Sequence, residues 1–292
     1  MAPALRHDVR GVTRLVLAFA MAGGCGRTSL EGAGDRVGDP EDPDDPDRVQ
    51  TCEEVDFLFV IDNSSSMADN QSKLVANYAT FIDGIARTVH RLESIHVGVT
   101  TTDAYSYNNF ACRGLGGLVV ETGGRASSSR ACGPYAEGFN FMTDADDLED
   151  TFRCAAQVGT EGSAKEAAAT AAVAALSSPM TDVGACNDGF VRDGALLVLV
   201  IVTDEDSELD PLIAAQALTD AKNGRADDVV IVALANAPDA ECAVDNEGRV
   251  ADDLARLTEL FRHGFIGPIC APDYGGVFEE AVAVVEAACP GT

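Results

Sequence analysis

The sequence predicts an α/β protein with a doubly wound, mostly parallel central sheet flanked by helices. Four apolar runs, at residues 57–61, 96–101, 195–202 and 229–235, are continuous or nearly so. Strands that are buried on both faces have this composition. Segments of helical character lie between the runs, and such alternation is typical of a sheet covered by helices. In an open sheet of this kind, ligands bind at the carboxyl ends of the central strands.

The helices predicted between these strands follow from helical spacing of apolar residues, and we expect them at residues 71–92, 147–156, 163–176, 212–222, 251–262 and 276–288. One stretch, residues 102–146, breaks the alternation. It is rich in Gly, Ser, Asn and aromatic residues and has only a brief apolar piece at residues 117–120. We interpret it as an elaborated loop region, which serves either recognition or irregular connection.

The first 24 residues have the features of an export signal. Three arginines precede an apolar run at residues 15–22, which two glycines and Cys25 follow. A permanent membrane-spanning helix needs about 20 apolar residues, so this run favours a cleaved signal. The small residues before Cys25 resemble the lipobox of bacterial lipoproteins, which implies that Cys25 is acylated. Ala22 stands where the lipobox usually has Leu, so secretion with cleavage nearby remains the alternative.

Residues 26–51 are predicted to form an extended tether, because acidic residues and prolines alternate there with almost no apolar side chains. The folded domain is expected at residues 52–290, with residues 102–146 as an excursion from it.

The chain has 48 acidic side chains against 20 basic ones, a net charge of −28 and no Trp. Nucleic-acid binding needs clustered basic residues, so we expect no such partner.

Nucleotide binding also has no support, since the chain lacks a phosphate-binding or dinucleotide-binding glycine motif.

The chain has nine cysteines, and eight remain once Cys25 is assigned to the lipid. No Cys or His spacing matches a zinc site. These cysteines predict a disulfide framework formed in an oxidising compartment. We therefore expect an extracytoplasmic protein.

A candidate metal site follows the first predicted strand directly. Asp62, Ser64 and Ser66 place a carboxylate and two hydroxyls at alternate positions. Mg²⁺, Mn²⁺ and Ca²⁺ prefer such oxygen donors. The alternative is that these residues only cap the helix that begins near Met67.

Two further segments bring oxygen donors to the same edge of the predicted sheet. The strand at residues 195–202 ends in Thr203-Asp204-Glu205-Asp206, and a loop containing Thr160 precedes an Ala-rich helix. The DxSxS sequence, the later loop Thr and the strand-end Asp resemble, in this order, the metal-ion-dependent adhesion site of the von Willebrand factor type A (VWA) family, whose fold is Rossmann-like. The resemblance implies a divalent metal, Mg²⁺ first and Mn²⁺ or Ca²⁺ as alternatives, on residues Asp62, Ser64, Ser66, Thr160 and Asp204. Glu205 and Asp206 are extra carboxylates beside Asp204; we expect them to face solvent, and the alternative is that they tune the affinity of the site toward Ca²⁺.

The resemblance extends over about residues 52–290, and it is closer still to secreted bacterial A domains with a Cys before the first strand and a late Ile-Cys pair. In that fold the entry to the first strand lies near the end of the last helix, which implies a Cys52–Cys289 disulfide. Sequence proximity suggests the remaining pairs, which are Cys112–Cys132, Cys154–Cys186 and Cys242–Cys270.

The resemblance implies a binding protein of the bacterial cell envelope, at the outer membrane or cell surface, that captures an acidic group of a protein ligand and catalyses nothing. Its only membrane contact would be the lipid anchor; a secreted or periplasmic protein is the alternative. A second interpretation is a structural envelope component with an unused metal site. A third is a magnesium-dependent phosphatase of the haloacid-dehalogenase type with Asp62 as nucleophile. Such enzymes need an Asp two residues later, where this chain has Ser64.

Overall fold

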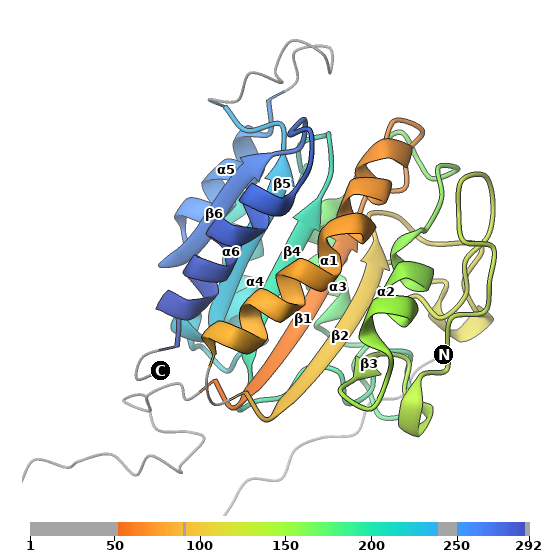
Figure 1. Ribbon diagram of the computed structural model, residues 1–292, viewed down its shortest axis with the longest axis horizontal. Coiled ribbons are helices and arrows are strands. Elements are labelled where there is room, and N and C mark those ends of the chain that lie inside the picture. Colours follow the sequence, from red (N-terminus) through yellow and green to blue (C-terminus); the bar gives the residue numbers. More distant parts are fainter. Residues whose placement is uncertain (1–51, 90–91, 239–249, 290–292) are drawn as a thin grey trace, which may run out of the picture. The chain divides into compact units, whose positions relative to one another are not determined.

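The computed structural model describes residues 52–89, 92–238 and 250–289, and these contain one six-stranded sheet in the order β3-β2-β1-β4-β5-β6 (Figure 1). Its strands are β1 (Glu54–Ile61), β2 (Ser94–Thr101), β3 (Met142–Thr143), β4 (Leu196–Val202), β5 (Val229–Ala235) and β6 (His263–Pro268). All neighbours run parallel except β3, which is antiparallel to β2. The predicted doubly wound, mostly parallel sheet is confirmed.

The four predicted strands are the four central ones, and each starts within three residues of its predicted start. The two edge strands were not predicted, because neither is an apolar run. β3 has two residues, and β6 has the sequence HGFIGP, in which only two of six residues are buried. Edge strands are covered on fewer sides than central ones, so they need no continuous apolar sequence.

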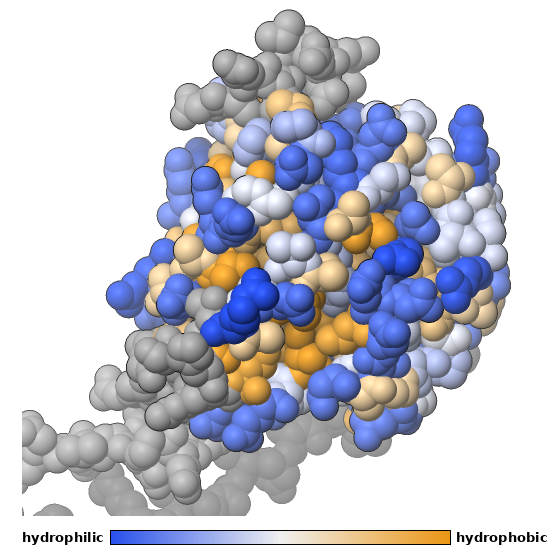
Figure 2. Space-filling view, viewed as in Figure 1, coloured by the Kyte–Doolittle hydropathy of each residue, from blue (hydrophilic) through white to orange (hydrophobic). Residues whose placement is uncertain are grey.

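Helices cover both faces of the sheet. On one face α1 (Ala68–Thr88) contacts α2 (Leu148–Ala156) and α6 (Gly275–Ala287). On the other face α4 (Pro211–Asp220) contacts α3 (Ala168–Ala175) and α5 (Asp252–Glu259). Hydrophilic side chains predominate on the first face, with apolar side chains showing between them (Figure 2). The helix predicted from residue 163 begins only at Ala168, and the preceding residues instead form a loop at the carboxyl end of the sheet.

An aromatic cluster joins β1 to the helices of the first face. Phe59 lies 4.7 Å from Phe152 and 5.9 Å from Tyr78 between ring centroids, and Phe81 lies 4.7 Å from Phe278. All of these rings are at most 1% exposed. Each buried aromatic side chain contributes a large apolar area, so the cluster fixes α1, α2 and α6 against the central strand.

The loop excursion packs its apolar piece against β2. The Val119 N–H donates to the Val99 carbonyl over 2.7 Å, and Val119 is 1% exposed. The buried Asn108 side chain donates to the carbonyls of Cys112 and Leu118 and accepts from the Val120 N–H. Buried backbone N–H and C=O groups need hydrogen-bond partners, which a neighbouring strand normally supplies. Here the side-chain amide supplies them, so this irregular backbone can be buried.

Three disulfides are present in the described residues: Cys52–Cys289, Cys112–Cys186 and Cys132–Cys154. The first is the pair that the resemblance implied. The pairs Cys112–Cys132 and Cys154–Cys186 were wrong, because the excursion folds onto distant segments instead of closing on itself. The Asn187 side chain bonds Gly116 and Leu118, which brings Cys186 to Cys112, and the Ser128 hydroxyl donates to the Cys154 carbonyl, beside Cys132. The predicted Cys242–Cys270 pair involves Cys242, which lies outside the described residues.

The predicted export signal at residues 1–24, the acylated Cys25 and the tether at residues 26–51 also lie outside the described residues. Within residues 52–89, 92–238 and 250–289, no helix is both long and apolar enough to cross a membrane.

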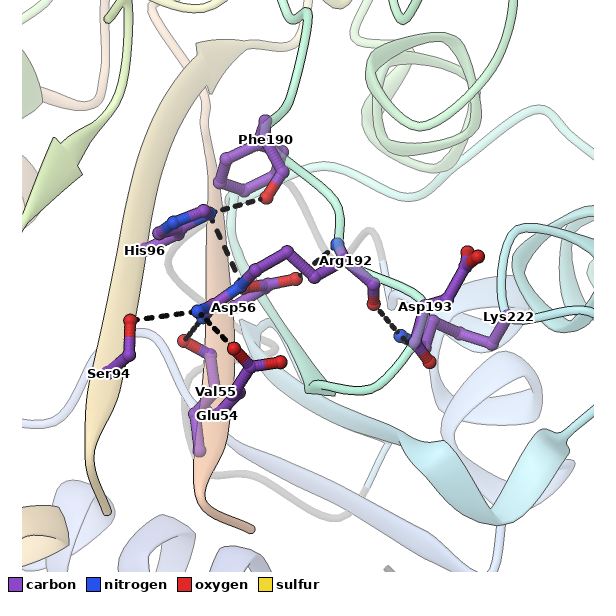
Figure 3. Close-up of polar contacts among 9 residues, drawn as sticks. All are labelled: Glu54, Val55, Asp56, Ser94, His96, Phe190, Arg192, Asp193 and Lys222. Atoms are coloured by element: carbon purple, nitrogen blue, oxygen red, sulfur yellow. Dashed lines mark hydrogen bonds and ion pairs between the residues drawn. The ribbon is translucent and has the colours of Figure 1, made fainter. Parts of the chain in front are cut away.

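A buried ion pair holds the beginning of β1 (Figure 3). Asp56 is 0% exposed and accepts hydrogen bonds from the Arg192 backbone N–H at 2.7 Å and from Arg192 Nε at 2.8 Å. The same guanidinium donates to Ser94 Oγ on β2, and the Arg192 carbonyl accepts from the buried Lys222 ammonium. One arginine therefore connects two strands to the segment that leads into β4.

Replacing Asp56 by Ala should lower the free energy of unfolding by about 3–5 kcal/mol, because it leaves the Arg192 guanidinium without its buried partner. Urea denaturation measures this change, with the exposed carboxylate Asp69→Ala as the control. Asp56 lies at the opposite end of β1 from Asp62, so divalent-metal affinity should be unchanged. A variant as stable as the wild type would contradict the structural role of this pair.

Replacing both Cys52 and Cys289 by Ala should lower the free energy of unfolding by about 2–5 kcal/mol. This disulfide closes a loop with a sequence separation of 237 residues, which is the largest of the three, and it restricts the unfolded chain accordingly. Thermal unfolding of the oxidised variant against the oxidised wild type measures the loss. An unchanged melting temperature would show that the domain needs no link between its two ends.

Candidate metal centre

The carboxyl end of β1 presents Asp62 in a fixed orientation. The Asp62 N–H donates to the Val202 carbonyl at 2.9 Å, which continues the parallel pairing of β1 with β4. Asp62 Oδ2 accepts from the Thr203 hydroxyl at 2.7 Å, and Oδ1 accepts from the Ser64 N–H at 2.7 Å. The side chain is 0% exposed. Both oxygens are held, and each keeps a lone pair for a further partner.

The two serines follow in the turn that leads to α1. Their hydroxyl oxygens lie 3.2 Å apart; Ser64 is buried and Ser66 is exposed. The N-cap residue of α1 is Met67, and no side chain makes a cap hydrogen bond there. The alternative interpretation of Asp62, Ser64 and Ser66 as a helix cap is therefore wrong. The hydroxyls of Ser64 and Ser66 contact each other and make no cap hydrogen bond to the helix.

Asp204 follows β4 and is 7% exposed, and its Oδ1 atom has no hydrogen-bond partner among the described residues. A buried carboxylate oxygen without a donor is costly. Asp206, which was expected to face solvent, instead accepts from the Asp253 and Leu254 N–H groups and caps the first turn of α5. Glu205 is half-buried, and its N–H donates to Thr203 Oγ1.

Thr160 lies in the loop between α2 and α3 and is 6% exposed. Its N–H and its hydroxyl both donate to the Arg125 carbonyl, at 2.9 and 3.3 Å. A hydroxyl that donates its one hydrogen keeps its lone pairs, so the Thr160 oxygen can still coordinate a metal. The excursion at residues 102–146 thus orients a residue of the predicted site.

The side chain of Gln71, on α1, ties the Thr160 loop to β1. Its Nε2 atom donates to the Asp62 carbonyl at 3.0 Å and to the Gly159 carbonyl at 2.8 Å, and its Oε1 atom accepts from the Gly159 N–H at 3.2 Å. Gly159 has a φ of +89°, and a Cβ there would lie 2.9 Å from the Arg125 carbonyl. Sequence reasoning missed Gln71; the only signal was a polar residue on the buried side of a helix that follows the DxSxS motif.

Acidic groups dominate the electrostatics of this end of the sheet. Burial raises the pKa of Asp62 to about 6; the nearby Asp204 charge adds to the rise, and the hydrogen bonds from Ser64 and Thr203 oppose it. Glu166, which sequence reasoning also missed, is 2% exposed. Burial raises its pKa to about 8, with Asp62 the next largest cause. Bringing these carboxylates together requires a compensating positive charge or a proton.

The donor set fits a divalent cation. Asp62, Ser64, Ser66, Thr160 and Asp204 would hold the ion, and the unpartnered Asp204 oxygen is the observation that supports this fit. Such an ion would supply a positive charge that accepts a further oxygen ligand. In the described part of the chain no group of three or more His, Cys, Asp or Glu side chains is arranged to hold a metal. Hydroxyl ligands are therefore essential to this site.

No protein-family model matches the chain, and no curated protein matches its sequence. Solved structures with a similar arrangement of elements include proximal thread matrix protein 1 from the mussel byssus, at 12% identity and a TM-score of 0.45, over 82% of this chain and 49% of that one. The same mussel protein with a zinc-occupied MIDAS motif matches at 15% identity and a TM-score of 0.38, over 82% and 47%. The human COPII-coat protein Sec24c matches at 14% identity and a TM-score of 0.35, over 79% and 31%. The chain thus spans about half or less of the length of these proteins.

Replacing Gln71 by Leu should weaken divalent-metal binding by about 10-fold or more, because the Thr160 loop loses its link to Asp62. The free energy of unfolding should fall by about 1–3 kcal/mol, since buried backbone groups of Asp62 and Gly159 lose their partners. Calorimetric metal titration and urea denaturation measure the two effects. Gln216→Leu, on the exposed side of α4, is the matched control and should change neither.

Proposed function

We propose that this chain is an extracytoplasmic binding protein that uses one divalent metal to capture an acidic group of a protein ligand. The observation that supports it is the pair of buried carboxylates at adjacent strand ends. Asp62 and Asp204 repel each other, and Asp204 Oδ1 has no partner among the described residues. The charged side chain that acts on Asp62 among the described residues is the acidic Asp204. A cation on this pair removes both penalties.

The ligand set determines what the metal does. Two carboxylates and three hydroxyls leave the ion only partly coordinated by charged groups, so it keeps affinity for an incoming carboxylate. Ser66 is the exposed member of the set, which leaves the solvent side of the site open to a ligand. Mg²⁺, Mn²⁺ and Ca²⁺ all suit oxygen donors, and the resemblance to the VWA family favours Mg²⁺.

The three disulfides support an extracytoplasmic location, because such bonds form and persist in oxidising compartments. We propose further that Cys25 carries a lipid and that residues 26–51 hold the domain away from a bacterial membrane. The acidic, proline-rich composition of those residues favours an extended chain.

The rival catalytic function has less support from the site. In a phosphatase, Asp62 would have to attack a phosphoryl group with the help of an acid and base close by in the chain. Ser64 occupies the position at which such an enzyme needs an acid and base. A structural protein with an unused site would have no need for the unpartnered Asp204 oxygen.

Titrating Mg²⁺, Mn²⁺ and Ca²⁺ into the full mature chain should show one bound ion, and Asp62→Asn should abolish its binding by removing a charged ligand of the same shape. Calorimetry measures both, with Asp69→Asn on α1 as the exposed control.

Capture of an acidic group is tested on an immobilised peptide library with a fixed Asp, against the same library with Asn, in the presence of metal and in EDTA. We expect binding only with Asp and metal together. A folded wild type that binds no metal would refute the proposed function.

A further inference from the structure

The described sheet ends at β6, and the outer edge of this strand is unpaired (Figure 1). The Ile269 N–H donates to the Ala235 carbonyl and continues the pairing of β6 with β5. Successive residues of a strand direct their backbone groups to opposite sides, so Gly264 and Ile266 direct theirs away from β5. Among the described residues, no hydrogen bond to these outward N–H and carbonyl groups is present.

β6 itself carries little that would protect this edge. Natural sheets usually protect an edge with charged side chains, with proline or with a covering segment. The strand has the sequence HGFIGP, which contains no Asp, Glu, Lys or Arg, and its proline is the last residue. The Pro268 carbonyl accepts from the Ala271 N–H, which closes the turn after the strand. Phe265 and Ile266 are only half-buried, so both apolar side chains remain accessible.

A hollow lies beside β6 on each face of the sheet. On the face of α6, a groove with a volume of about 660 Å³ is lined by Phe265, Gly267 and Val277, among others. On the face of α5, a hollow of about 420 Å³ is lined by Ile266 and Ala255, among others. Side chains of an extended chain point alternately to the two faces of a sheet. A strand added beside β6 would therefore place alternate side chains in the two hollows.

The charge of the two hollows selects the occupant. Their charged lining residues are all acidic: Asp273, Glu279 and Glu280 on the face of α6, and Glu259 on the face of α5. Residues 26–51 are acidic too, and a second copy would bring the same acids and a net charge of −28, so both would be repelled. Lys and Arg are attracted, because their apolar stems cover the floor of the groove while the charge reaches its acidic rim.

We propose that the outer edge of β6 binds an extended segment of another protein, which adds a strand to the sheet and carries Lys or Arg at alternate positions. Backbone hydrogen bonds to Gly264 and Ile266 hold the segment, and the two hollows select its side chains. β5 separates this edge from β4, whose end leads to Asp204. Binding at β6 is therefore independent of the metal centre and needs no metal.

The first test uses a fluorescent peptide of about ten residues in which Val and Lys alternate, and a matched peptide in which Val and Glu alternate. Fluorescence anisotropy with the full mature chain, in EDTA, measures binding. We expect the Val–Lys peptide to bind and the Val–Glu peptide not to bind. Two further Val–Lys peptides are N-methylated, one at every Val and the other at every Lys. Alternate N–H groups face the same edge of a strand, so one methylated peptide should lose binding and the other should keep it.

The second test changes the protein. Ile266→Pro removes the outward N–H and spares the pairing with β5, whereas Ile266→Ala shortens the side chain and keeps the N–H. We expect Ile266→Pro to weaken binding of the Val–Lys peptide by at least about 10-fold, and by more than Ile266→Ala does. Joint replacement Glu279→Gln and Glu280→Gln should weaken it by about threefold or more. Glu286→Gln, an exposed residue of α6 outside the groove, is the control and should change nothing.

Equal binding of the two N-methylated peptides would show attraction by charge alone and would overturn the inference. A wild type that binds no Val–Lys peptide would overturn it as well. A wild-type dimer that Ile266→Pro abolishes, seen by sedimentation, would assign the edge to a second copy instead. If Ile266→Pro does not fold, the N-methylated peptides decide the question on the wild type.

Discussion

The register of β1 between β2 and β4 is the constraint on which the rest of the structure depends. Ile61 pairs with Thr101 on one side and Val202 on the other, so the chain leaves all three strands at the same level. A slip of one residue would turn every side chain of β1 to the opposite face of the sheet. The aromatic contacts of Phe57 and Phe59 would be lost, and Asp62 would no longer lie beside Thr203. Core packing and the metal site therefore require the same register.

A buried carboxylate lies at each end of β1, Asp56 at its start and Asp62 directly after it, and the two have different partners. Asp56 and Asp62 are six residues apart, so they lie on the same face of an extended strand. Asp56 has a full set of partners from Arg192, and its pairing with His96 and Leu197 fixes the start of the strand. Asp62 has only hydroxyl and amide donors, and an acid as its charged neighbour. One end of the strand has a complete set of charged partners, and the other is the end at which we propose that a cation binds.

The sequence predicts those parts of the molecule that depend on local pattern. The central strands have enough apolar residues to be found, and Asp62, Ser64 and Ser66 are found because they are adjacent in the chain. β3 and β6 are missed because edge strands need no apolar run. The disulfides of the excursion are mispredicted because distant asparagine and serine contacts, and not chain proximity, decide which cysteines meet.

Gln71 and Glu166 are missed for a related reason. Each is an ordinary polar residue in a helix or a loop, and only the folded chain shows that it is buried. The side chain of Gln71 binds two backbone segments, at Asp62 and at Gly159, and Gly159 is 88 residues away from it in the sequence. Glu166 is held by the Thr102 hydroxyl, and acidic side chains on other segments help to raise its pKa. No pattern in the sequence around either residue carries that information.

The arrangement also explains why binding and stability should be coupled at this end of the sheet. Rigid elements hold the carboxylates: β1 and β4 fix Asp62 and Asp204, and Gln71 fixes the loop before Glu166. The domain cannot relax the repulsion by moving these groups without losing hydrogen bonds that hold the strand ends. A ligand that binds only the folded state stabilises it in proportion to the logarithm of its concentration over its dissociation constant. The repulsion among the crowded carboxylates in the folded chain would therefore strengthen the binding of a cation at this end of the sheet.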